Sequence, residues 1–227
     1  MLPAHRAELL ERVPDGARVL DVGGWAAPLH RADAVIDLMP YATRGLYGTP
    51  DPAPERFTAA TWVVRDVCAH EPWPFADDAF DFVVCAHTLE DLRDPIRVCE
   101  EMSRVAKAGY LEVPSRLEEQ AWGVEGPWTG WSHHRWLVDA DREAQALTFT
   151  FKSHVVHAPG RYLPEGFAAT LTPEQRIEWL WWEGSVRASE KVHLGADTLE
   201  PYLRDFVAAH APPPTGWRAQ ARRRLRR

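Results

Sequence analysis

The stretch FDFVVCAHTLEDLRDPIRVCEEMSRVAKAGYLEV, residues 80–113, predicts a buried strand, a helix and a second buried strand. The short run at 80–86 is apolar apart from Asp81, as in a strand that is covered on both faces of a parallel sheet. Asp94 and Pro95 then form a helix N-cap with proline in the first turn, and apolar residues recur at helical spacing up to Gly109. This order of elements indicates a parallel α/β sheet.

Three more apolar runs lie upstream and predict further strands of the same sheet. They occupy residues 17–22, 34–36 and 62–64, and residues 3–12 predict a helix before them. The connection between the first two strands is only about a dozen residues long and contains Pro28, so its helix must be short or absent. The expected fold is α/β, with a Rossmann-like, doubly wound and mostly parallel sheet.

The pattern changes after Pro114. Residues 147–157 alternate like an antiparallel or edge strand, and residues 200–209 predict a short helix. The segment 173–189, which contains three tryptophans, looks helical, and aromatic residues at its spacing are more often core than ligand platform.

These patterns suggest a division of the chain into three parts. We expect residues 1–114 to form a ligand-binding core. Residues 115–216 would complete the same domain with an antiparallel edge, a Trp-rich elaboration and an acceptor pocket, and residues 217–227 would be a basic tail.

Composition narrows the class of protein. With 227 residues, 45% of them hydrophobic, the chain can bury one substantial core. The sequence shows neither a signal-peptide pattern nor a membrane-spanning run, so the expected location is the cytoplasm. The cysteines are odd in number and lie in apolar surroundings, which predicts reduced, buried thiols at Cys68, Cys85 and Cys99.

Charge is distributed unevenly along the chain. The net charge is −7, and six arginines lie in residues 217–227, which leaves −7 − 6 = −13 on residues 1–216. An acidic body argues against general nucleic-acid binding. The tail is either a solvated basic end or a weakly amphipathic helix that contacts a membrane surface or an acidic partner.

Glycines and carboxylates follow the first strands. The strand at 17–22 contains Asp21 and runs into Gly23 and Gly24, where the missing side chains allow a ligand to approach the backbone at the carboxyl end of the sheet. Asp37 closes the second strand, where a carboxylate can accept hydrogen bonds from a ribose diol.

Residues 17–114 resemble the small-molecule methyltransferase family of the class I S-adenosylmethionine-dependent fold, with a type 11-like methyltransferase domain. The resemblance is carried by the Pro-Trp-Pro-Phe approach at 72–75, the Asp-Phe strand entry at 81–82, the His-x-Leu-Glu-x-Leu exit at 87–92 and the Gly-Tyr-Leu strand at 109–111. It implies an S-adenosylmethionine-dependent methyltransferase.

The resemblance also implies roles for the residues of the first two strands. Gly23 and Gly24 would lie against the methionine part of S-adenosylmethionine, and Asp37 would bind its ribose hydroxyls. Asp21 would organise the glycine loop, near the amino group of the cofactor.

A second group of roles follows from the third and fourth strands. Asp66 and Val67 would bracket the adenine through a carboxylate and a backbone amide. His87, Thr88 and Leu89 would line the cofactor pocket.

The chain departs from the family at the glycine loop, where Trp25 stands at the place of a second spaced glycine. This departure leaves room for an inactive methyltransferase-like binding or scaffold subunit. A nicotinamide-dependent reductase on the same fold is disfavoured, because the short crossover lacks a helix N-terminus for a pyrophosphate.

The acceptor side is predicted at residues 122–136, which mix tryptophans with two histidines. His133 or His134 would serve as general base for a hydroxyl acceptor, or both would only hold a loop by hydrogen bonds. Metal binding by these residues with His154 and His157 is disfavoured, because side chains at such spacings on a strand point to opposite faces. We expect no metal.

The acceptor itself is expected to be a small molecule, such as a sugar, a glycan precursor or a secondary metabolite. The sequence leaves the nucleophilic atom and the oligomeric state open.

Overall fold

A computed structural model describes residues 1–48 and 53–212. Its main sheet has the strand order β3-β2-β1-β4-β5-β8, in which the first five strands are parallel and β8 is antiparallel to β5. The strands are β1 Val19–Val22, β2 Ala34–Asp37, β3 Trp62–Val64, β4 Phe82–Ala86, β5 Ala108–Pro114 and β8 Ile177–Glu183. The five parallel strands that the sequence predicts are confirmed.

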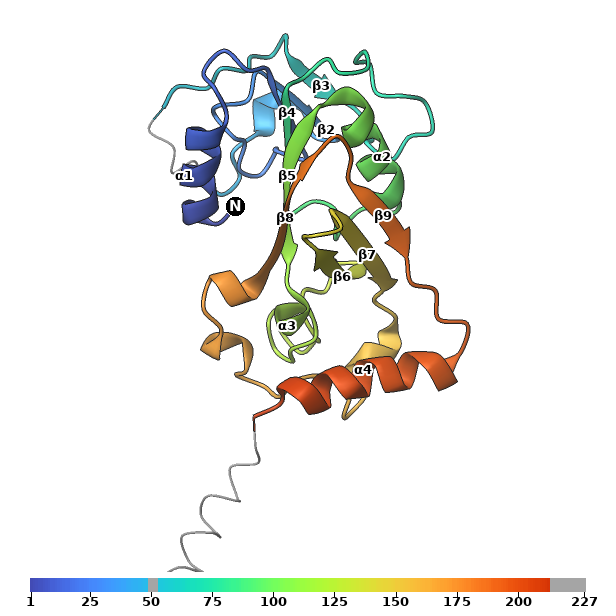
Figure 1. The fold of residues 1–227 in the computed structure, drawn as a ribbon. Helices are drawn as coiled ribbons and strands as arrows, with labels where there is room; N and C mark the ends of the chain where they lie inside the picture. The colour runs from blue at the N-terminus through green and yellow to red at the C-terminus, as the bar shows by residue number, and fades with distance from the viewer. Residues whose placement is uncertain (49–52, 213–227) are drawn as a thin grey trace, which may run out of the picture.

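Helices cover both faces of this sheet. Helix α1 (Pro3–Arg12) lies on one face and α2 (Pro95–Val105) on the other (Figure 1). Successive residues of β1 alternate between the two cores, because Val19 packs in the cluster that includes α1 and Leu20 in the cluster that includes α2. The doubly wound arrangement is therefore confirmed.

The predicted start of α2 is also confirmed. The side chain of Asp94 accepts a hydrogen bond from the backbone N–H of Arg97 at 3.0 Å, and Pro95 occupies the first turn.

The crossover from β1 to β2 contains no helix within residues 23–33, as its length predicts. A short 3₁₀ helix, Tyr41–Thr43, follows β2.

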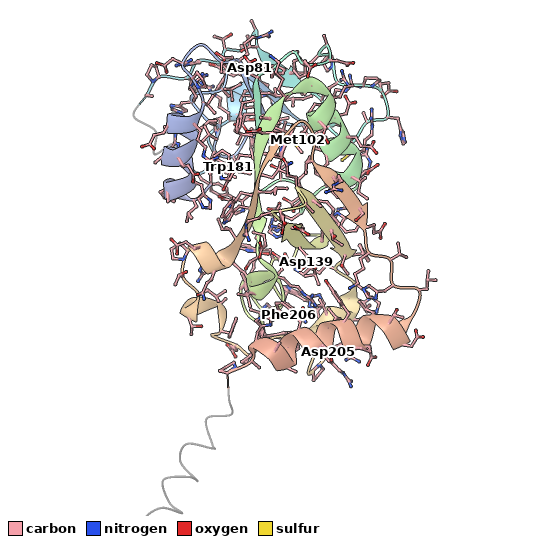
Figure 2. The ribbon with its side chains drawn as sticks, in the orientation of Figure 1. Asp81, Met102, Asp139, Trp181, Asp205 and Phe206 are labelled. Carbon is pink, nitrogen blue, oxygen red and sulfur yellow. The ribbon has the colours of Figure 1, made fainter. Side chains whose placement is uncertain are left out.

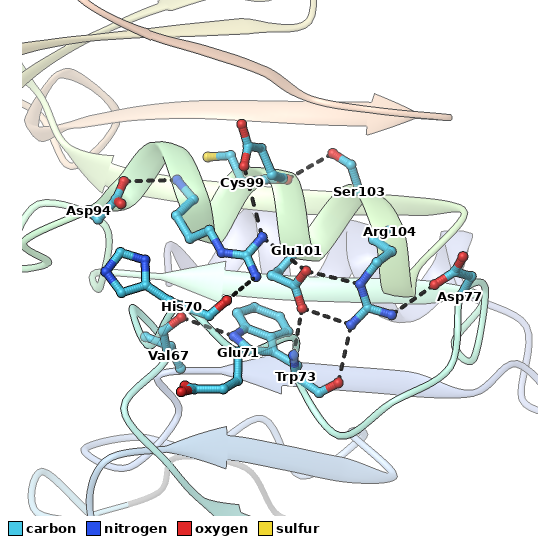
Figure 3. A network of polar contacts seen from close by, with 12 residues as sticks. Val67, His70, Glu71, Trp73, Asp77, Asp94, Cys99, Glu101, Ser103 and Arg104 are labelled. Atoms are coloured by element: carbon cyan, nitrogen blue, oxygen red, sulfur yellow. Dashed lines mark hydrogen bonds and ion pairs between the residues drawn. The ribbon is translucent and has the colours of Figure 1, made fainter.

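A buried polar network ties the segment after β3 to α2 (Figure 3). Glu101 accepts the backbone N–H of Trp73 at 2.6 Å and the guanidinium of Arg104 at 2.7 Å. The indole of Trp73 is buried and donates to the carbonyl of Val67 at 3.0 Å. The Pro-Trp-Pro-Phe stretch thus fixes the path of the chain between β3 and β4.

The C-terminal part builds a second sheet with the order β6-β7-β9. Its strands are β6 Trp136–Asp141, β7 Ala146–Phe151 and β9 Arg187–Glu190, and it lies on the α2 side of the main sheet (Figure 1). The remaining helices are α3 Arg116–Glu119, three 3₁₀ turns at His154–His157, Ala168–Thr170 and Glu174–Arg176, and α4 Ala196–His210. Helix α4 includes the predicted 200–209.

The prediction of a helix over 173–189 is wrong. Residues 177–183 form β8, in which Trp179 and Trp181 face the α1 side and Trp182 is buried on the α2 side. Figure 2 shows Trp181 beside α1, where the guanidinium of Arg12 lies 4.7 Å from its ring centroid. Aromatic residues favour strands, and pairing along β5 covers an otherwise open sheet edge. Trp182 belongs to the core, as the sequence predicts, and Trp179 and Trp181 are partly buried against it.

The single strand predicted over 147–157 is also corrected. Strand β7 ends at Phe151, and residues 154–157 form a 3₁₀ turn capped by Ser153. The strand is antiparallel to β6 as expected, but it is the central strand of the small sheet.

Three other predictions concern the cysteines, membrane-spanning segments and the basic tail. The three cysteines are free and buried. Within the described residues, the helices are all too short or too polar to cross a membrane. The basic tail, 217–227, lies outside the described residues.

Candidate functional site

A cavity of about 670 Å³ opens at the carboxyl ends of the parallel strands. Its lining includes six residues that the sequence assigns to cofactor binding, Asp21, Gly23, Gly24, Asp37, His87 and Thr88. It also includes the acceptor-side residues Trp131, His133 and His134, so the two predicted halves of the site share one cavity.

The glycine loop after β1 has no room for side chains. A Cβ atom on Gly23, whose φ is +74°, would lie 2.2 Å from the hydroxyl of Thr88. A Cβ atom on Gly24 would lie 2.2 Å from a carboxylate oxygen of Asp21. The same oxygen of Asp21 accepts the backbone N–H of Leu29 at 2.8 Å, so this buried carboxylate organises the loop.

Asp37 holds the loop from the neighbouring strand. One carboxylate oxygen accepts the backbone N–H of Trp25 at 3.0 Å, and the other accepts that of Met39 at 2.7 Å. Burial, together with the nearby charge of Asp37, raises the pKa of Asp21 to about 7. A cation bound near Asp21 would stabilise its ionised form.

His87 follows β4 in the left-handed region, with φ +53°. Its Nε2 atom lies 2.9 Å from a carboxylate oxygen of the buried Glu112. Burial alone would lower the pKa of His87, but the hydrogen bonds to Glu112 and Glu90 outweigh it and raise the pKa to about 9. His87 is therefore a cation in the cavity wall at neutral pH.

Three predicted cofactor residues do not line this cavity. Asp66 is held by the guanidinium of Arg93 and by the backbone N–H of Cys68. Val67 and Leu89 are buried in the core on the α2 side. Their cofactor roles remain predictions.

The acceptor-side wall is a loop that docks on the segment after β4. The backbone N–H of Arg135 donates to the carbonyl of Glu90, and the indole of Trp136 donates to that of Leu92, both at 2.7 Å. Of the tryptophans in the predicted wall, Trp131 lines the cavity, whereas Trp122, Trp128 and Trp136 do not.

His134 is held from behind by a buried ion pair. Its Nδ1 atom lies 2.6 Å from one carboxylate oxygen of Glu119, and the other oxygen accepts from Lys152 at 2.7 Å. Burial lowers the pKa of His134, but Glu119 outweighs this effect, so the pKa is raised. A histidine held in this way is a poor general base near neutral pH.

Sequence reasoning missed Asp91, although it lies within the His-x-Leu-Glu-x-Leu exit. One oxygen of Asp91 lies 3.9 Å from Nε2 of His133 and 3.8 Å from Nε2 of His134. Adjacent histidines point apart on a strand, but these two lie in a loop, and their ring centroids are 4.4 Å apart. A carboxylate after β4 followed by a later histidine pair was the available signal.

Comparison with known proteins agrees with this geometry. A family model described as a methyltransferase domain matches residues 41–111. Two uncharacterised methyltransferases of Mycobacterium leprae, from strains Br4923 and TN, are 28% identical to the chain over 153 residues. These matches support the resemblance to the class I methyltransferase family. The matched region covers 60% of this chain and 49% of each relative, so the chain spans about half the length of the curated relatives it matches.

Solved structures include similar chains at low identity. An S-adenosylmethionine-dependent methyltransferase from Mesorhizobium loti is 16% identical, with 64% of this chain and 62% of that chain covered and a TM-score of 0.35. A SAM-dependent methyltransferase from Aquifex aeolicus is 20% identical, with 54% and 69% covered and a TM-score of 0.33. At these TM-scores the likeness carries no weight for function.

Proposed function

We propose that the chain transfers a methyl group from S-adenosylmethionine to a small-molecule acceptor. The observation that carries this proposal is the glycine loop, whose bare backbone and buried Asp21 face the same cavity as Trp131 and the two histidines. Asp21 suits the ammonium group of the methionine part, because a cation compensates a buried carboxylate.

Residues at the carboxyl ends of β1, β2 and β4 would hold the cofactor. Gly23 and Gly24 would contact the methionine part, Asp37 the ribose hydroxyls, and Thr88 the floor of the pocket. When bound, S-adenosylmethionine supplies an electrophilic methyl group on sulfur. The protein's own task is then to orient the acceptor in line with that group and to accept a proton where the nucleophile carries one.

The acceptor would bind against Trp131 and His133, which line the same cavity as the glycine loop. An aromatic wall with polar groups suits a sugar, a glycan precursor or a secondary metabolite. His133, which is more exposed than His134, is the better placed of the two for the role of general base. Three further predictions stay predictions. They are the division of the chain at residue 114, the cytoplasmic location, and the contact of the basic tail with an acidic partner or a membrane surface.

Two rival functions make different predictions for ligand binding. A nicotinamide-dependent reductase needs a helix N-terminus for its pyrophosphate, and residues 23–33 contain no helix. An inactive scaffold subunit would bind S-adenosylmethionine weakly or not at all, or would bind it without turnover. Calorimetric titration with S-adenosylmethionine, S-adenosylhomocysteine and NAD, followed by a methyl-transfer screen over small hydroxyl and amine acceptors, separates these functions.

Replacing Asp37 with alanine should weaken binding of S-adenosylhomocysteine. The variant loses the ribose hydrogen bonds and the carboxylate that holds Trp25, at a cost of about 1–3 kcal/mol of binding free energy. Calorimetry measures the change. Asp205→Ala, on the exposed face of α4 at the far end of the molecule (Figure 2), is the control and should bind normally. Equal affinity in the two variants would show that the ribose does not bind at Asp37.

Binding of S-adenosylhomocysteine should strengthen as the pH rises from 6 to 8. The pKa of Asp21 is raised to about 7, so the free protein carries a proton there at pH 6, and pairing with the ligand's ammonium requires its release. The free energy of unfolding has the opposite pH dependence. The stability that neutral Asp21 contributes is fully present below its ordinary pKa of 3.8 and is lost as the pH rises through about 7. Calorimetry across this range, in buffers of different ionisation enthalpy, measures the proton release.

The variant Asp21→Asn is the control for this titration. It cannot ionise, so its affinity should be lower at pH 8 and should change little with pH. A pH dependence that is the same in both proteins would assign the titration to another group.

A further inference from the structure

The acceptor-side wall carries a set of donor atoms that no step of the proposed methyl transfer needs together. Asp91, His133 and His134 each offer one ligand atom, and these atoms all lie within 4.8 Å of one another. They come from two segments that are far apart in sequence, and the backbone hydrogen bond from Arg135 to Glu90 holds those segments together.

The histidines are oriented in the way that metal ligands usually are. The Nε2 atoms of both face the same oxygen of Asp91, at 3.9 Å and 3.8 Å. Their Nδ1 atoms face carboxylates, that of His134 at 2.6 Å from Glu119 and that of His133 at 3.7 Å from Glu125. Histidines that bind metals commonly direct their second nitrogen to a carboxylate in this way, which fixes the ring orientation.

The shared oxygen of Asp91 is buried and, within the described residues, lacks a hydrogen-bond partner. An oxygen of the neighbouring Glu90, whose side chain is 1% exposed, is also unpartnered in that part of the chain. Buried carboxylate oxygens without donors are costly unless a cation compensates them. Lys152 does not fill this role, because its ammonium group is engaged by Glu119 and the carbonyl of Trp131.

We propose that Asp91, His133 and His134 bind a divalent first-row transition-metal ion, such as Zn²⁺, in the acceptor side of the cavity. Two imidazoles and one carboxylate are a ligand set that such ions accept, with positions left open. Metal–ligand bonds of about 2.0–2.2 Å place tetrahedral donor atoms about 3.4 Å apart, so the present separations of up to 4.8 Å must shorten by up to about 1.4 Å. Side-chain rotation in a loop permits that approach.

The proposed metal binding does not depend on methyl transfer. The role of the metal, in contrast, rests on the proposed function. All three ligands line the cavity that also contains the glycine loop. A bound ion would supply a Lewis acid that lowers the pKa of an acceptor hydroxyl. Both histidines would then be ligands rather than general bases.

Titration of the full, tag-free chain with Co²⁺ tests the proposal directly. After treatment with a chelator, the protein should bind one equivalent of Co²⁺ and develop visible absorption bands, and Zn²⁺ should displace it. Mg²⁺, which prefers oxygen ligands, should not compete. Absence of stoichiometric Co²⁺ binding would overturn the proposal.

Three variants assign the site. His133→Ala and Asp91→Asn alter partly exposed side chains and should each weaken Co²⁺ binding by about tenfold or more. His154→Ala removes an exposed histidine outside the cluster and should leave it unchanged. Equal affinity in all three variants would overturn the assignment. Titration with S-adenosylhomocysteine in the same samples separates the two proposals. A protein that binds S-adenosylhomocysteine but not Co²⁺ contradicts only the metal site. A protein that binds Co²⁺ but not S-adenosylhomocysteine contradicts only the proposed function.

Discussion

Replacing Gly23 with alanine should abolish measurable binding of S-adenosylmethionine. The residue has φ +74°, which costs an L-amino acid about 1–2 kcal/mol. The new methyl group would also lie 2.2 Å from the hydroxyl of Thr88, and overpacking of this kind costs about 1–3 kcal/mol. The loop must therefore move at the place where the cofactor is proposed to bind. Calorimetry should give at least about a hundredfold loss of affinity, equivalent to about 2.7 kcal/mol.

Two further variants separate the causes of this loss. Gly160 has φ +82°, and no atom lies within 4 Å of the position that an alanine methyl group would take there, so Gly160→Ala tests backbone strain alone and should bind the cofactor normally. Adding Thr88→Ala to Gly23→Ala removes two of the three atoms that the new methyl group meets, and should restore part of the affinity. Full-strength binding by Gly23→Ala would mean that the cofactor does not contact this loop.

The cofactor side of the cavity could be predicted because its signals are local. A strand that ends in glycines, and a neighbouring strand that ends in Asp37, place their side chains at one sheet edge in any parallel sheet. The same reasoning could not tell that Asp66 is drawn to Arg93, since that contact joins residues 27 positions apart through side chains alone.

The C-terminal part was harder to predict for a different reason. The run IEWLWWE is compatible with helical and with strand spacing, and only the open edge of β5 selects the strand. The pairing of β7 with β9 joins residues about 40 positions apart and leaves no local pattern. The acceptor-side chemistry depends on such contacts, because Glu119 meets Lys152 across 33 positions.

Replacing Lys152 with methionine should destabilise the protein strongly. The ammonium group is 2.7 Å from Glu119 and 2.7 Å from the carbonyl of Trp131, and the side chains of Lys152 and Glu119 are 4% and 1% exposed. Methionine keeps the length of the side chain but leaves a buried carboxylate without this partner. Removal of one member of a buried ion pair costs about 3–5 kcal/mol, which thermal and urea unfolding would measure.

Lys107→Met is the matched control, because Lys107 forms an ion pair with Asp81 at the same 2.7 Å but with side chains that are 59% and 42% exposed. Such a surface pair contributes at most about 1 kcal/mol. Adding Glu119→Gln to Lys152→Met removes the stranded charge and should recover part of the lost stability. Similar unfolding curves for the two lysine variants would show that Glu119 finds enough compensation in His134 alone. In that case the loop of Trp131 and His134 would be held mainly by its backbone bond to Glu90, since that contact does not depend on Lys152.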